Sequence, residues 1–155
     1  MKNLKKTDPQ IFDLIKQEEK RQKDVLEMIA SENYASQAII ETLGSVLTNK
    51  YSEGFPGKRY YQGNAVIDQI ESLAQERAQK LFGVPYVNVQ PLSGAPANSA
   101  VYMAVLKNGE KLMGLALTSG GHITHGHKLG LSGRLFTFAH YTLGEDGKLD
   151  YDAIE

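Results

Sequence analysis

The stretch YVNVQPLSGAPANSAVYMAVLKNGEKLMGLAL, residues 86–117, decides the fold class. Residues 86–90 and 111–117 are apolar runs of strand length, whereas the apolar positions of residues 93–106 recur at the spacing of a helix face. Residues 135–140 form a third strand candidate. Strand, helix and strand in this order predict an α/β unit with a parallel sheet.

The residues before this unit predict helices. Asp8 can cap a helix whose first residue is Pro9, and Ser36 can open a second helix. Asn64 then precedes a long amphipathic segment that ends at Gly83, a residue suited to a helix C-terminus. We therefore expect a helical arm in front of the α/β unit.

Composition excludes several classes of protein. The chain has 155 residues, 17 Lys plus Arg, 18 Asp plus Glu and a net charge of −1, which argues against nucleic-acid or membrane binding through bulk charge. It has no cysteine, so disulfide scaffolds and thiol nucleophiles are excluded. The polar N-terminus does not resemble a signal peptide, and we expect a cytoplasmic protein without a membrane partner.

The last residues predict a helix start. Asp150 can cap a helix that begins at Tyr151, but the sequence stops at Glu155 within the first turn. Domains rarely end in this way, so we expect that the native polypeptide is longer.

A first candidate site lies between the predicted strand at 86–90 and the following helix. Ser93, Gly94 and Ala95 stand at the helix start, where unpaired N–H groups and the helix dipole suit a phosphate. The alternative is an ordinary strand-to-helix turn with a serine cap.

A second candidate is the loop GGHITHGH, residues 120–127. Three histidines within six residues raise the possibility of a metal site, although no carboxylate lies in the loop. The other possibilities are an imidazole offered to a planar ligand and a flexible loop with solvated histidines.

A third candidate is Glu53, in an aromatic loop that precedes the long helix. Neighbouring tyrosines can raise the pKa of this carboxyl group towards the range that proton transfer needs. The alternative is a surface ion pair with Lys58 or Arg59.

Four blocks in this order resemble serine hydroxymethyltransferase. They are IASENY (29–34), LTNKYSEGFPGKRYYQG (47–63), NVQPLSGAPANSAVY (88–102) and SGGHITHG (119–126). The resemblance covers essentially the whole chain. It implies the aspartate aminotransferase-type fold, fold type I, which binds pyridoxal 5′-phosphate (PLP). Residues 1–63 would be a helical arm with an active-site loop, and residues 64–155 an incomplete PLP-binding large domain.

The resemblance also implies a transferase of one-carbon metabolism. Such enzymes convert serine and tetrahydrofolate to glycine and 5,10-methylenetetrahydrofolate, and they form homodimers or tetramers. The resemblance implies catalytic roles for Glu53, Tyr61 and His122, with His122 stacked on the cofactor ring. It implies phosphate contacts from Ser93, Gly94, Ala95 and, across the subunit boundary, Tyr51. Ser31 would contact the substrate carboxylate, and the folate site would include Leu117, Gly121, His122 and Ile123.

No lysine of this chain matches the family's Schiff-base lysine, so we expect the 155 residues alone to be inactive. Two alternatives remain. One is another fold type I enzyme such as a threonine aldolase, which binds no folate. The other is a non-catalytic module that pairs through the apolar stripes at 11–15 and 39–47.

Overall fold

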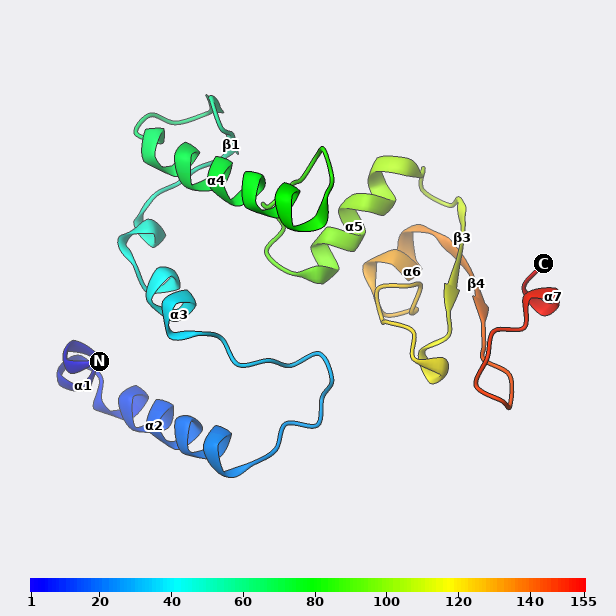
Figure 1. Ribbon diagram of the computed structural model, residues 1–155, viewed down its shortest axis with the longest axis horizontal. Coiled ribbons are helices and arrows are strands. Elements are labelled where there is room, and N and C mark those ends of the chain that lie inside the picture. The colour runs from blue at the N-terminus through cyan, green and yellow to red at the C-terminus, as the bar shows by residue number, and fades with distance from the viewer. The chain divides into compact units, whose positions relative to one another are not determined.

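The computed structural model describes all residues from 1 to 155, and they divide into two units (Figure 1). Unit 1 comprises Met1–Gly54 and Arg59–Gln62, and unit 2 comprises Phe55–Lys58 and Gly63–Glu155. None of the helices is both long and apolar enough to cross a membrane.

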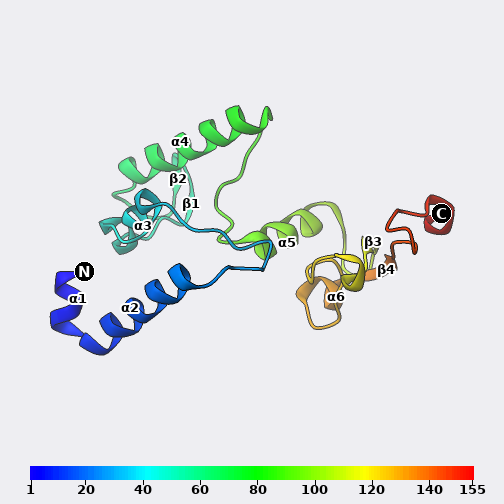
Figure 2. The ribbon, with the colours of Figure 1, turned by 60° about the horizontal axis from the view of Figure 1, so that its bottom comes forward.

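Unit 1 begins with four helical segments. They are α1 (Lys2–Thr7), α2 (Pro9–Asp24), α3 (Gln37–Leu43) and the 3₁₀ helix η1 (Val46–Asn49). Two predicted caps are confirmed, because Asp8 Oδ1 accepts from Ile11 N at 3.0 Å and Ser36 Oγ accepts from Ile39 N at 3.4 Å. Figure 2 shows α2 following α1 at the start of the chain.

Two strands of two residues each, β1 (Gly54–Phe55) and β2 (Lys58–Arg59), form a small hairpin between the arm and the long helix. The loop predicted around Glu53 therefore contains a short strand pair, which the sequence did not predict. Gly54 in β1 has φ 98° and Gly57 in the turn has φ 73°, a region that favours glycine.

Unit 2 contains four helices, two strands and one 3₁₀ turn. They are α4 (Ala65–Phe82), α5 (Gly94–Val105), β3 (Lys111–Leu115), η2 (Leu117–Ser119), α6 (Leu131–Leu135), β4 (Thr137–Tyr141) and α7 (Tyr151–Ile154). The predicted end of α4 is confirmed, because Gly83 adopts a left-handed conformation with φ 64°.

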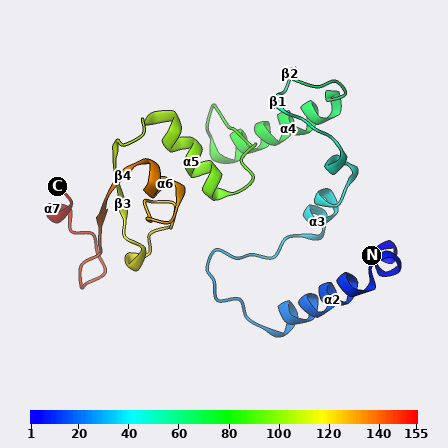
Figure 3. The same ribbon diagram turned by 180° about the vertical axis from the view of Figure 1, so that it is seen from behind.

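The predicted parallel pairing is confirmed for the last two strands. β3 and β4 run parallel, in a register that pairs Lys111 with Thr137 and Leu115 with Tyr141. Figure 3 shows the two strands side by side, with α5 and α6 next to them. A parallel pair places both carboxyl ends at the same edge, where ligands bind in open α/β sheets.

The predicted strand at 86–90 is wrong. A strand needs a neighbouring backbone, and the described sheets contain only the β1–β2 and β3–β4 pairs. Local side-chain bonds hold this segment instead: Asn88 Oδ1 accepts from Gln90 N at 2.9 Å, and Glu71 Oε1 accepts from Gln90 Nε2 at 2.8 Å.

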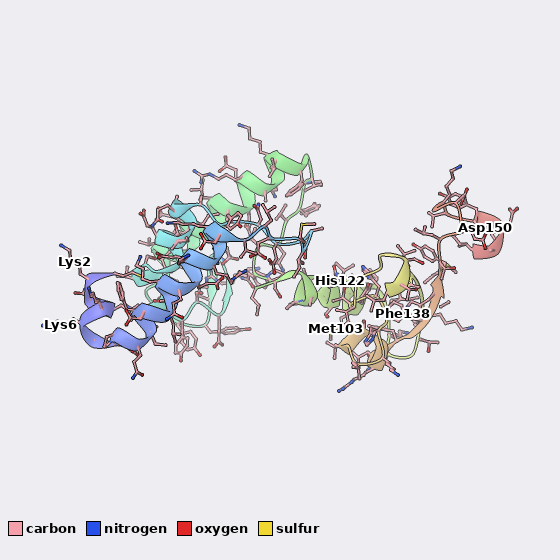
Figure 4. All side chains as sticks on the ribbon, turned by 90° about the horizontal axis from the view of Figure 1, so that it is seen from below. Lys2, Lys6, Met103, His122, Phe138 and Asp150 are labelled. Carbon is pink, nitrogen blue, oxygen red and sulfur yellow. The ribbon has the colours of Figure 1, made fainter.

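The packed centre of unit 2 is aromatic. Phe136 is 6% exposed and is the single buried apolar side chain of the chain. The ring of Tyr102 meets Phe136 and Phe138 edge-on, with centroid distances of 6.0 and 6.1 Å. These three rings join α5 to the end of α6 and to β4, and Figure 4 labels Phe138 among the surrounding side chains.

Candidate active site

The N-terminus of α5 keeps its hydrogen-bond donors available. Ser93 is extended, with φ −162° and ψ 174°, and its side chain makes no capping bond. The N–H groups of Gly94 and Ala95 lie in the first turn, where a helix has no internal acceptor for them. A Cβ added at Gly94 would meet nothing within 4 Å, so the space beside this residue is open. Two N–H groups and a hydroxyl at a helix start suit a phosphate.

The loop after β3 folds back on the end of its own strand. Ala116 O accepts from both Ser119 N and Gly121 N, each at 2.9 Å. A Cβ at Gly121 would lie 1.9 Å from Leu115 O, so only glycine fits this fold-back. The loop thereby holds Leu117, His122 and Ile123 at the carboxyl edge of the sheet, and all three side chains are exposed.

Hydrogen bonds connect this loop to α5. Asn98 Nδ2 donates to Thr124 Oγ1 at 2.8 Å, and Thr124 Oγ1 lies 2.7 Å from His122 Nδ1. The Tyr102 hydroxyl, one helical turn beyond Asn98, bonds to His125 Nδ1. Burial raises the pKa of Tyr102 above its ordinary value, which keeps the hydroxyl protonated. The helix that carries Ser93 therefore also fixes the loop that carries His122.

A pocket of about 330 Å³ lies beside this loop. Its walls come from the end of β3, the histidine loop and β4, and its lining includes Ala116, Leu117, His122, His125, Lys128 and His140. Figure 4 labels His122 in this part of unit 2. The histidines do not converge on one point: His125 Nδ1 bonds to Tyr102, and His127 Nδ1 accepts from Leu129 N at 3.3 Å. No group of three potential metal ligands is close enough to hold an ion.

Unit 1 brings together the second set of predicted residues. The guanidinium of Arg59 donates to Ser52 O at 2.6 Å and to Gly54 O at 2.8 Å, on either side of Glu53. Glu53 O accepts from Tyr60 N at 3.2 Å, and the Glu53 side chain is exposed. The Arg59 donors thus shape the backbone around this carboxylate.

The two predicted tyrosines of this loop lie close to each other. The rings of Tyr51 and Tyr61 have centroids 6.2 Å apart, and Lys50 Nζ lies 6.0 Å from the Tyr61 centroid. Lys50 Nζ also donates to Tyr51 O at 2.8 Å, so one cation restrains both aromatic residues.

Ser31 lies in a turn that a charged network holds against α2. Arg21 bonds to both Glu18 and Glu27 at 2.8 Å, and the hydrogen bonds from Arg21 and Gln22 lower the pKa of Glu18 to about 2. Tyr34 OH donates to Gln22 O at 3.2 Å, beyond the turn. Ser31 itself is exposed.

The role of Arg59 in shaping the hairpin can be tested by substitution. Arg59→Met removes both carbonyl contacts but keeps an unbranched aliphatic stem. We expect amide exchange at Tyr60 to become about tenfold faster, since a hydrogen bond from a charged donor contributes about 1.5 kcal/mol or more. Lys58→Met, on the same hairpin, is the control for loss of charge. Equal acceleration in both variants would contradict this role of Arg59.

Sequence reasoning did not find Asn98, Tyr102 and Thr124 as parts of this site. One signal was present. Asn98 is a poor helix former in a helix interior, four residues before a tyrosine and therefore on the same helix face. The acceptor, Thr124, lies 26 residues further along the chain, and no local pattern predicts that pairing.

The fold and these contacts define an α/β protein with a pocket at the carboxyl edge of a parallel strand pair. Comparison with known proteins identifies the family. The sequence profile of the serine hydroxymethyltransferase family matches residues 4–155, and the chain belongs to this family.

Individual relatives agree with the family match. The chain is 57% identical over 154 residues to a serine hydroxymethyltransferase of Desulfotalea psychrophila. It is 56% identical over 152 residues to one of Francisella philomiragia. The alignments cover 99% and 98% of this chain but 36% of each relative, so the chain spans about a third of their length.

Proposed function

We propose that the chain forms part of a PLP-dependent serine hydroxymethyltransferase. The reaction interconverts serine plus tetrahydrofolate with glycine plus 5,10-methylenetetrahydrofolate. One observation of the structure supports this most directly: the hydrogen bonds from Asn98 through Thr124 to His122 connect the open N-terminus of α5 with the predicted ring-stacking imidazole. Family membership over residues 4–155 supports the same reaction class and does not favour the threonine aldolase alternative.

The residues of unit 2 fit PLP. Its phosphate would accept from Ser93 Oγ and from the N–H groups of Gly94 and Ala95, whose surroundings are open. The exposed ring of His122 offers a planar face to the pyridine ring. When bound, PLP supplies an electron sink for charge that develops at the amino-acid α-carbon. Tyr51 would reach the phosphate of a neighbouring subunit.

The remaining predicted residues would act on the substrates. Glu53 would transfer a proton near the serine hydroxyl and the folate, as an exposed carboxylate in a shaped hairpin can do. Tyr61 would lie at the substrate, and Ser31 would contact its carboxylate. Leu117, Gly121 and Ile123 would line the folate site together with His122.

The same resemblance supports a wider proposal for the protein. Residues 1–63 would be a helical arm with the active-site loop. Residues 64–155 would belong to the large PLP-binding domain of a fold type I enzyme. The assembly would be a cytoplasmic homodimer or tetramer.

The phosphate site can be tested with a pair of isosteric variants. Ser93→Asp places a carboxylate beside the proposed phosphate, whereas Ser93→Asn has the same shape without the charge. Both residues are good helix caps, so α5 should form in either variant. We expect PLP affinity to be at least about tenfold weaker for the aspartate variant than for the asparagine variant.

The measurement is a PLP titration of the full-length apoenzyme that contains this chain. An assay of tetrahydrofolate-dependent glycine formation from serine follows. Equal PLP affinities in the two variants would contradict the phosphate site. PLP binding without any folate-dependent glycine formation would contradict the proposed reaction.

A further inference from the structure

Two residues on one face of α5 hold the histidine loop. Asn98 and Tyr102 are four positions apart, so they lie one above the other on the helix surface. Asn98 Nδ2 donates to Thr124 Oγ1 at 2.8 Å, and Tyr102 bonds to the ring of His125. The two contacts reach the ring of His122 in different ways. Thr124 lies within hydrogen-bond distance of its Nδ1, whereas the His125 ring meets it edge to face, with centroids 6.2 Å apart.

The direction of these hydrogen bonds is fixed by chemistry. Thr124 N lies 3.2 Å from His122 Nδ1, and a backbone N–H can only donate. Nδ1 must therefore be an acceptor, without a proton of its own. The Thr124 hydroxyl accepts the amide proton of Asn98, so its own proton is available for the same Nδ1 at 2.7 Å. Two donors thus converge on one ring nitrogen.

We propose that Asn98, acting through Thr124, is a positioning residue that holds the imidazole of His122 in one orientation and, when the ring is uncharged, in the tautomer with its proton on Nε2. An unrestrained imidazole exchanges its proton between the two nitrogens and rotates about its bond to Cβ. Donors on Nδ1 suppress both freedoms, because either change would place an N–H or a C–H against them.

The orientation and tautomer of His122 follow from the hydrogen bonds alone. Their consequence for cofactor binding deepens the proposed function and rests on it. The hydrogen bonds from Asn98 through Thr124 to His122 form a relay. If His122 stacks on a cofactor ring, this relay presents one tautomer of the ring in a constant plane. Ser93 is the N-cap of the same helix, so phosphate donors and ring orientation share one rigid element. The relay covers neither face of the ring, because its bonds lie at the ring edge.

The relay predicts what happens when the hydrogen-bond donor at position 98 is replaced by an acceptor. Asn98→Asp replaces the donor with an acceptor of the same shape. The Thr124 hydroxyl would then donate to the aspartate, and its oxygen would be free to accept from His122 Nδ1–H. We expect the proton of His122 to move from Nε2 towards Nδ1, against the remaining donation from Thr124 N.

The test reads the protonated ring nitrogen directly. Long-range ¹H–¹⁵N correlation spectra of the intact apoprotein, recorded where the imidazole is neutral, identify which nitrogen of His122 carries the proton. We expect a single Nε2–H form in the parent protein, a mixture of both forms in Thr124→Val, and the parent spectrum again in Thr124→Ser. Tyr102→Phe is the matched control, since it removes the tether to His125 but keeps both Thr124 donors and should leave the tautomer of His122 unchanged.

Two results would overturn the proposal: an Nδ1–H form of His122 in the parent protein, or the same tautomer mixture in the parent, Thr124→Val and Asn98→Asp proteins. The parent measurement alone decides the first point, even if a variant fails to fold. PLP affinity is measured separately. Absence of PLP binding by the parent protein, together with the expected tautomer changes in the variants, would refute the proposed function and leave the relay intact.

Discussion

Glu53→Gln is expected to lower tetrahydrofolate-dependent cleavage of serine by about 10²–10⁴-fold in the intact enzyme. The amide has the shape of the carboxyl group but cannot take up and release a proton. The backbone around residue 53 should persist, because Arg59 donates to Ser52 O and Gly54 O, and Tyr60 N donates to Glu53 O. PLP affinity is therefore expected to stay within about threefold of the parent value.

The measurement is the rate of glycine formation with and without tetrahydrofolate, beside a PLP titration. Glu76→Gln, which removes an exposed carboxylate from α4, is the control for charge. Glu53→Asp retains a carboxylate on a shorter side chain. Its rate of glycine formation should lie between those of the parent and the glutamine variant. Full folate-dependent activity in Glu53→Gln would refute proton transfer by this residue.

Gly126→Ala is expected to destabilise the protein by about 2–5 kcal/mol. Gly126 has φ 89°, a conformation that disfavours alanine. A Cβ there would also lie 2.1 Å from Phe138 Cγ. Phe138 cannot easily move, because Tyr102 meets it edge-on and His140 stacks on it at 5.9 Å.

Gly120→Ala separates these two causes. Gly120 has φ 97°, but a Cβ there would meet nothing within 4 Å. We expect it to cost about 1–2 kcal/mol, from the backbone term alone. The urea midpoint of the apoprotein, measured at one protein concentration, gives both values. Equal losses in the two variants would show that Phe138 yields to the added methyl group.

Local chemistry explains which parts of the fold could be predicted. A cap acts within three residues, so Asp8 and Ser36 mark their helix starts in the sequence itself. Gly83 marks a helix end for the same reason. The segment 86–90 has the composition of a strand, but pairing depends on a partner that no local pattern contains. The sheet of this chain offers it none.

Some residues of the candidate site could likewise be predicted from the sequence, and others could not. Ser93 and Glu53 stand out because their residue types and immediate neighbours suggest a chemistry. Asn98 and Thr124 act through one hydrogen bond across 26 residues, which depends on where α5 lies against the loop. The three-histidine pattern allowed a metal, but Tyr102 and Leu129 N occupy two of the ring nitrogens. Tertiary partners, which the sequence does not display, decide what each histidine does.

The fold-back of Gly121 onto Leu115 O has a consequence for how such a pocket can evolve. Gly121 directly precedes the pocket-lining residue His122, and any Cβ at position 121 would collide with a carbonyl at 1.9 Å. Selection therefore cannot adjust this point of the loop by changing a side chain. Variation that tunes ligand preference must fall on flanking positions such as Leu117 and Ile123, whose side chains are exposed. Homologues should therefore keep glycine at this position, while the flanking residues differ between them.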